Sequence, residues 1–177
     1  MKKFGVIAAL ALVVAPTAVA GPAPNAADRA AAVRDCRMLR QAPPAGMGLA
    51  LFRQTYGTNA NRMNAFGMCL SKWGREERQN RLQAAAECRE ERGATAQSRA
   101  AFRQKYGTFG RCVREKRNAE SADDRADTMN AAQTCDTERG ETAASRAAFN
   151  EKYGRSENDR NAFGKCVSQT ARAQDGV

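Results

Sequence analysis

The stretch NAFGKCV at residues 161–167 occurs almost unchanged as NAFGMCL at 64–70 and in a shorter form, TFGRCV, at 108–113. In the first of these segments Phe163, Cys166 and Val167 stand at positions i, i+3 and i+4, which share one face of an α-helix. An apolar face of this kind packs toward a protein core. The three segments therefore predict three helices, each of which carries one cysteine inward.

Each segment closes a longer unit that begins at another cysteine, and the units span 36–70, 88–113 and 135–167. Their tyrosines, Tyr56, Tyr106 and Tyr153, recur at intervals of 50 and 47 residues, a period typical of stacked supersecondary units. We predict an all-α fold in which three helical repeat units stand in a row. The predicted boundaries are 29–81, 82–120 and 121–170, with flexible segments at 21–28 and 171–177.

Every unit is predicted to contain three helical pieces. The first is rich in alanine and ends at a glycine, Gly93 or Gly140, of the kind that stops helices. The second, SRAAFRQKYG or SRAAFNEKYG, is expected to take Ser98 or Ser145 as its N-cap. The third contains the Phe-Gly-x-Cys stretch. Aromatic residues of these pieces are expected to form small core clusters. They are Phe52, Tyr56, Phe66, Trp73, Phe102, Tyr106, Phe109, Phe149, Tyr153 and Phe163.

Two features of the units allow more than one interpretation. A glycine follows each phenylalanine, at Gly67, Gly110 and Gly164, although glycine inside a helix costs about 1 kcal/mol relative to alanine. The close approach of a neighbouring helix is the usual reason, and we expect it here. Segments 58–64 and 155–161 have no counterpart in unit two, and they are either loops or the first turns of the third piece.

Few helix-breaking residues separate the third piece of one unit from the first piece of the next, which predicts long helices over roughly 66–92 and 109–139. On one helix Cys69 and Cys88 would lie about 28 Å apart, whereas a disulfide requires Cα atoms within about 7 Å. The same argument excludes a bond between Cys112 and Cys135. The simplest remaining scheme pairs the cysteines within each unit: Cys36–Cys69, Cys88–Cys112 and Cys135–Cys166.

Residues 1–20 are predicted to be a cleavable signal peptide. Lys2 and Lys3 precede an apolar stretch at 4–14, and AVA at 18–20 matches the small-residue cleavage pattern. All six cysteines lie beyond this segment, and an even cysteine count in an exported chain is typical of a disulfide framework. We therefore expect a secreted protein, extracellular or periplasmic. No second apolar run of membrane length follows, so we expect no transmembrane segment in the mature chain.

The pattern AFxxKYG…NAFGKCV, placed after an alanine-rich CxxERG, resembles repeats of secreted proteins from high-GC bacteria. The resemblance covers nearly all of the chain beyond the signal peptide, and unit three, residues 135–167, looks most typical. Unit two departs from the pattern by its seven-residue gap, and unit one departs by RQAPPAGMG at 40–48. The resemblance implies an exported helical repeat protein, and it supplies no catalytic residues.

The composition removes several classes of catalytic site. The chain has no histidine, which excludes histidine-based triads and histidine-ligated zinc. It also has no C-x-x-C, G-x-S-x-G or P-loop motif. Acidic pairs such as Asp123 with Asp127, or Glu76 with Glu77, are interpreted as ordinary charges on helix surfaces. We expect a protein without catalytic residues, bound metal or cofactor.

The formal net charge of the chain is +10, and it is unevenly distributed. Residues 21–81 carry a net charge of +6 and residues 82–120 a net charge of +4, whereas residues 121–177 carry −2. A basic helical surface attracts polyanions such as nucleic acid, anionic lipid or anionic wall polymer. The candidate polyanion-binding residues are Arg75, Arg78, Arg81, Arg99, Arg103, Lys105, Arg111, Arg114, Lys116 and Arg117.

These features lead to three functional hypotheses. In the first, the chain is an exported, non-catalytic structural or interaction module at the cell surface or in the medium, and its basic charge only keeps it soluble. In the second, units one and two bind an extracellular polyanion, either nucleic acid or an anionic wall polymer. The third, an enzyme that uses carboxylates alone, would need a concave site that stacked helical units seldom form. A polyanion or another protein would be the partner.

Overall fold

The computed structural model describes residues 23–154 and 161–174, and these residues form seven α-helices and no strands. The helices are α1 (Ala26–Leu39), α2 (Leu49–Tyr56), α3 (Ala65–Arg92), α4 (Ala96–Tyr106), α5 (Phe109–Arg139), α6 (Ala143–Tyr153) and α7 (Ala162–Gln174). The predicted all-α class is confirmed. The predicted signal peptide at 1–20 and the segment 155–160 lie outside the described residues. Within the described part, no helix combines the length and hydropathy needed to cross a membrane.

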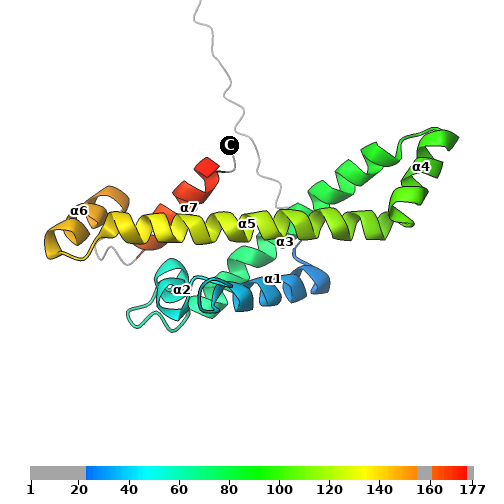
Figure 1. The fold of residues 1–177 in the computed structure, drawn as a ribbon. Coiled ribbons are helices and arrows are strands. Elements are labelled where there is room, and N and C mark those ends of the chain that lie inside the picture. Colours follow the sequence, from blue (N-terminus) through cyan, green and yellow to red (C-terminus); the bar gives the residue numbers. More distant parts are fainter. Residues whose placement is uncertain (1–22, 155–160, 175–177) are drawn as a thin grey trace, which may run out of the picture.

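Two long helices, α3 and α5, organise the molecule (Figure 1). They begin and end within one residue of the predicted ranges, and Gly93 and Gly140 cap their C-terminal ends with positive φ angles of 58° and 62°. The 31 residues of α5 extend over about 46 Å. In Figure 1, α6 lies at one end of α5, and α4 lies at the other. Contacts from Cys88 to Cys112 and from Asn80 to Asp124 show that α3 and α5 run antiparallel.

The three disulfides follow the predicted pairing. Their Cα atoms are 6.0 Å apart in Cys36–Cys69, 6.2 Å apart in Cys88–Cys112 and 6.1 Å apart in Cys135–Cys166. In the chain-entropy account, each bond stabilises the fold by about 3.5 kcal/mol, because it closes a loop in the unfolded chain. Disulfides of this number are compatible with an extracellular or otherwise oxidising compartment.

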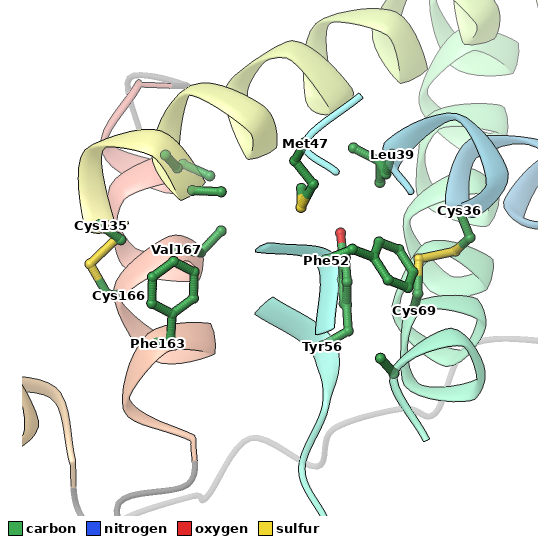
Figure 2. Packing of buried hydrophobic residues seen from close by; sticks show 14 of the residues in the cluster. Cys36, Leu39, Met47, Phe52, Tyr56, Cys69, Cys135, Phe163, Cys166 and Val167 are labelled. Carbon is green, nitrogen blue, oxygen red and sulfur yellow. A yellow bond between two sulfur atoms is a disulfide. The ribbon is translucent and has the colours of Figure 1, made fainter. Parts of the chain in front are cut away.

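The main hydrophobic core contains residues of both unit one and unit three (Figure 2). Leu39, Met47 and Phe52 lie between the Cys36–Cys69 disulfide on one side and Cys135–Cys166 with Val167 on the other. Units one and three therefore share one core, and the expectation that the three units stand in a row is wrong. The physical reason is that α3 and α5 run antiparallel. The chain after α5 therefore returns to the region of α2, where α7 packs against α2.

The second unit has a separate, small core at the far end of α3 and α5. Its buried residues are Cys88, Phe102, Tyr106 and Cys112, and Phe109 and Val113 pack against them. The rings of Phe102 and Tyr106 lie 5.0 Å apart between centroids, as their i,i+4 spacing predicts. We call this end, residues 86–116, the tip.

The glycines after the phenylalanines differ from one another. A Cβ atom on Gly164 would stand 2.6 Å from the carbonyl oxygen of Thr55, so α7 approaches α2 as closely as a glycine permits. A Cβ atom on Gly67 or Gly110 would meet nothing within 4 Å. The expected close approach is confirmed for Gly164 and wrong for the other two, because these positions face away from neighbouring helices.

Helix α4 is capped by Thr95 and helix α6 by Thr142, whose hydroxyls accept hydrogen bonds from the amides of Ser98 and Ser145. The prediction that the two serines are the N-caps is therefore wrong. Both helices begin three residues earlier, because threonine fills the capping role before the serine. Segment 58–64 consists of turns, so the loop interpretation holds there.

The predicted flexible segments are partly helical. Helix α1 begins at Ala26, inside the segment 21–28, because Asn25 and Asp28 form a reciprocal capping box. Helix α7 continues to Gln174, past the predicted start of the tail at 171, and Ala171 is buried. Both boundaries shift because these residues find packing partners on α3 and α5.

Candidate functional site

A buried polar centre lies where α1 and α5 pack against the middle of α3. The core positions of α3 continue every three or four residues from Trp73 to Glu77, Asn80 and Ala84. Two of these four are polar. The buried polar and charged residues of the described chain are Asp28, Asp35, Glu77, Asn80, Ser121 and Thr128. Between its two apolar cores, the protein is therefore held together by charge and hydrogen bonding.

The first buried carboxyl, Asp28 on α1, has no exposed surface and forms a two-pronged contact with Arg81 on α3. Nε of Arg81 donates to Oδ1 at 2.8 Å, and Nη2 donates to Oδ2 at 3.1 Å. Burial by itself raises the pKa of Asp28, but the hydrogen bonds from Arg81 and from the backbone of Asn25 outweigh it and hold the pKa below its usual value. Asp28 is thus a fully paired carboxylate.

The second and third carboxyls, Asp35 on α1 and Glu77 on α3, lie against each other with no exposed surface. Nη1 of Arg125 donates to Oδ1 of Asp35 at 2.7 Å, and the guanidinium of Arg117 approaches Glu77 at 3.6 Å. Oδ2 of Asp35 and both carboxylate oxygens of Glu77 accept no hydrogen bond from the described residues. A single proton held between the two carboxyls would join Oδ2 of Asp35 to one of the Glu77 oxygens.

Burial and the adjacent Asp35 carboxyl raise the pKa of Glu77 to about 7, although Ser121 and Arg117 act in the opposite direction. Near neutral pH the pair therefore has a proton available to share. Neither carboxyl reaches solvent, so no substrate can contact them. The pair affects the stability of the packing between α1 and α3. It lacks the contact with solvent or substrate that a catalytic acid requires.

The buried centre corrects two predictions from the sequence. Glu77 was expected on the surface, yet it is fully buried. Arg125 stands between Asp123 and Asp127 in a stretch interpreted as an exposed helix face, but its side chain is only 19% exposed and pairs with Asp35. The signal in the sequence is the spacing of Glu77, which follows Trp73 by four residues along the same apolar stripe.

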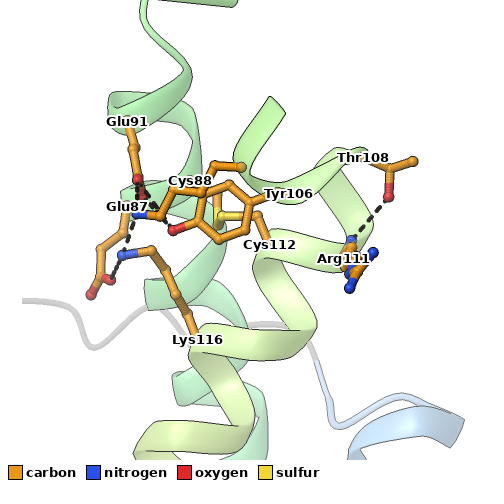
Figure 3. The surroundings of a disulfide bond; sticks show 9 residues. Glu87, Cys88, Glu91, Tyr106, Thr108, Arg111, Cys112 and Lys116 are labelled. Carbon is orange, nitrogen blue, oxygen red and sulfur yellow. Dashed lines mark hydrogen bonds and ion pairs between the residues drawn. A yellow bond between two sulfur atoms is a disulfide. The ribbon is translucent and has the colours of Figure 1, made fainter. Parts of the chain in front are cut away.

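At the tip, a hydrogen-bonded cluster surrounds the Cys88–Cys112 disulfide (Figure 3). Nζ of Lys105 contacts Glu91 at 2.5 Å, and the hydroxyl of Tyr106 donates to the same carboxylate at 3.0 Å. Lys116 on α5 approaches both Glu91 and Glu87. The hydrogen bond from Lys105 lowers the pKa of the Glu91 carboxyl. These contacts fix α4 to the two long helices.

The ten predicted polyanion-binding residues fall into separate groups. Four make ion pairs within the protein and so have part of their charge neutralised: Arg81, Lys105, Lys116 and Arg117. Arg75 is exposed and lines a cavity near α7, and Arg78 is partly buried on α3. The other four are exposed at the tip and make no ion pair with any described residue: Arg99, Arg103, Arg111 and Arg114.

Sequence reasoning missed two further arginines of the tip. Arg89 and Arg92 lie in the last turn of α3, are exposed, and make no ion pair within the described chain. The tip therefore presents six such arginines, in one pair from each of α3, α4 and α5. Only Glu90 and Glu115 are exposed there without an ion pair. Within each pair the two arginines are three or four residues apart, so they lie on the same face of their helix. The group can therefore be identified once the helix boundaries are known.

Cysteine, aspartate and glutamate side chains form no cluster of three or more that could hold a metal ion within residues 23–154 and 161–174. Asp123 is exposed, and Asp127 lines a cavity between α3, α5 and α7. No protein-family model, curated protein or solved structure matches the chain. The chemistry of its own residues is therefore the basis for any functional proposal.

Proposed function

We propose that the protein is an exported, non-catalytic interaction module whose tip binds an anionic polymer. The observation that carries the proposal is the group of six exposed arginines without ion pairs at the tip. Guanidinium groups bind phosphate and carboxylate through paired N–H donors. Three helices place these groups together at the end of the molecule farthest from α6 (Figure 1).

Two observations support a role in binding rather than in catalysis. The chain has no histidine, and its three fully buried carboxyls have no access to solvent.

The tip has a disulfide and a small core of its own. It can therefore present its arginines on a fixed surface, which lowers the entropic cost of binding.

Binding of the oxidised full-length protein to a DNA duplex and to an anionic polysaccharide tests the proposal. The test variant replaces Arg99, Arg103, Arg111 and Arg114 with glutamine. We expect this variant to lose at least tenfold in affinity for both polymers at low salt, because each arginine that contacts the polymer releases counterions from it.

The matched control replaces four exposed arginines outside the tip, Arg29, Arg37, Arg40 and Arg146, with glutamine. It removes the same net charge, and none of the four makes an ion pair in the described residues. We expect the control to bind nearly as well as the wild-type protein. Equal losses in the two variants would show that only the overall charge matters, and this result would overturn the assignment to the tip.

A further inference from the structure

A cavity of about 470 Å³ lies between the C-terminal end of α2, the first half of α3 and one face of α7. The lining residues of α7 recur at spacings of one to four residues on one face from Gly164 to Arg172, and those of α3 do so from Met68 to Arg75. Two helix faces therefore form its walls. The contact of Gly164 with the carbonyl of Thr55 brings the α7 wall against α2. Volumes of this size are typical of small-molecule sites.

The walls of this cavity carry positive charge. Four cationic side chains line it, Lys72 and Arg75 from α3 and Lys165 and Arg172 from α7, and no acidic residue of the described chain does. Arg75, Lys165 and Arg172 make no ion pair with any described residue. Lys72, Arg75 and Arg172 also line an adjoining cavity, whose walls include Glu76, Asp124 and Asp127. Like charges gathered in one cavity repel one another, and a bound anion would relieve that repulsion.

The C-terminal end of α2 also faces the cavity, and its carbonyl groups attract cations. A helix end carries only about half an elementary charge, which Arg75, Lys165 and Arg172 together exceed. Asn161 and the first turn of α7 lie on the opposite wall, and α7 contributes a positive helix end there. The cations that line the cavity thus outweigh the partial charges of the two helix ends.

The remaining polar lining consists of neutral hydrogen-bonding groups. Thr58, Ser71 and Ser168 supply hydroxyls, and Asn161 and Gln169 supply amides. Groups of this kind can donate to and accept from hydroxyl groups of a ligand. Cations together with hydroxyl and amide groups match a small molecule that carries an anionic group on a polyhydroxylated frame.

We propose that this cavity is a binding site for a small polyhydroxylated anion, namely a sugar that bears a phosphate or a carboxylate. The site lies on α2, α3 and α7 and shares no residue with the tip. It is therefore independent of the proposed binding of polymers by the arginines of the tip. Both head groups share the same recognition chemistry, and the experiment separates them.

Fluorescence of Trp73, the sole tryptophan of the chain, provides the readout. Nε1 of Trp73 donates at 2.9 Å to the hydroxyl of Tyr56, and Tyr56 lines the cavity. The oxidised full-length protein is titrated with glucose 6-phosphate, glucuronate and glucose at about 150 mM salt, where non-specific attraction between exposed charges is screened. Isothermal titration calorimetry supplies the stoichiometry.

We expect one saturable site for at least one of the two anions and no binding of glucose. The head group of the tighter anion identifies the ligand class. The variant R75Q/R172Q is expected to weaken binding at least tenfold, and the variant K165Q to weaken it less. The control R37Q/R40Q, with the same change in net charge, and the tip variant are expected to bind as the wild-type protein does.

Thermal unfolding of each variant establishes that it is folded, and all of the replaced side chains are exposed or partly exposed. The proposal is wrong if neither anion binds up to about 10 mM, a concentration at which even a millimolar site is filled. It is also wrong if glucose binds as tightly as the anions, or if R75Q/R172Q and R37Q/R40Q bind equally well.

Discussion

The carboxyl group of Glu77 on α3 lies against the carboxyl group of Asp35 on α1, and neither side chain has exposed surface. Two buried carboxylates in contact repel each other strongly, so a proton held by the pair stabilises it. Arg125 and Arg117 each approach one member of the pair. The junction of α1, α3 and α5 is therefore a charge network whose stability depends on pH.

The free energy of unfolding should fall as the pH rises from about 4.5 to about 7 because of Glu77. Its pKa is raised from 4.5 to about 7 in the folded protein, so the folded state holds this proton more tightly than the unfolded state does. The contribution is fully present below the unfolded pKa and is lost at the upper end of this window. Its size is on the order of 3 kcal/mol. Urea unfolding measured across pH 5 to 8 checks the slope.

The variant Glu77→Gln isolates this effect from other carboxyls. Glutamine keeps the shape of the side chain, can donate to Asp35 and does not titrate. We expect it to be as stable as the wild-type protein at pH 5 and more stable at pH 8. The control Glu76→Gln should keep the wild-type slope. Identical slopes in wild type and Glu77→Gln would show that Glu77 does not hold the proton.

Replacing Arg81 with glutamine should destabilise the protein by about 3 kcal/mol, because it leaves the buried Asp28 carboxylate without its cation. The loss should be largest near neutral pH. It should shrink as the pH falls through the low pKa of Asp28, since the protonated carboxyl no longer needs a charge partner. Chemical unfolding at two pH values measures it. Arg89→Gln, an exposed change on the same helix, is expected to lie within about 0.5 kcal/mol of wild type.

Replacing each of the three glycines that follow a phenylalanine with alanine should lower the stability at one position and raise it at the other two. Gly164→Ala is expected to destabilise the protein by about 1–3 kcal/mol, because its Cβ would stand 2.6 Å from the carbonyl oxygen of Thr55. Gly110→Ala and Gly67→Ala should each stabilise it by up to about 1 kcal/mol, because the added Cβ atoms meet nothing within 4 Å. Thermal unfolding of the three variants tests this. A shift in the same direction in all three would contradict the packing of α7 on α2.

Removal of the tip disulfide should loosen the tip and leave the main core intact. The tip core has four buried residues, and two of them are Cys88 and Cys112. In the double variant Cys88→Ala/Cys112→Ala, we expect fast amide hydrogen exchange in α4 and unchanged protection in α1 and α7. The control Cys135→Ala/Cys166→Ala should increase exchange in α7. Equal loss of protection throughout the tip variant would show that the fold is a single cooperative unit.

Local features of the fold could be predicted from the sequence. Glycines such as Gly93 and Gly140 mark the helix ends, and the i,i+3 and i,i+4 spacings place the aromatic residues and cysteines on inward faces. The disulfide pairing follows from the length of a helix between two cysteines. These inferences succeed because each depends on residues close together in the chain.

Features that depend on contacts between distant segments could not be predicted. The sequence does not show that α7 returns to α2, because Gly164 resembles Gly67 and Gly110 in its local pattern. The spacing after Trp73 places Glu77 on the inward face of α3, but the sequence does not show which residue it meets there, because its partner Asp35 lies on another helix. The sequence also does not show which of the predicted polyanion-binding arginines are paired inside the protein and which are exposed. Arg81 and Arg117 stabilise buried carboxylates, whereas Arg99 and Arg103 are exposed at the tip.

The salt dependence of DNA binding tests the central claim most directly. The logarithm of the binding constant of the full-length oxidised protein is measured against the logarithm of salt concentration for the wild-type protein, the tip variant and the matched control. If the four tip arginines contact phosphates, the slope for the tip variant should be shallower than that of wild type by about 3 to 4, at about 0.9 per contact. The control should keep the wild-type slope. An unchanged slope and affinity in the tip variant would contradict the account.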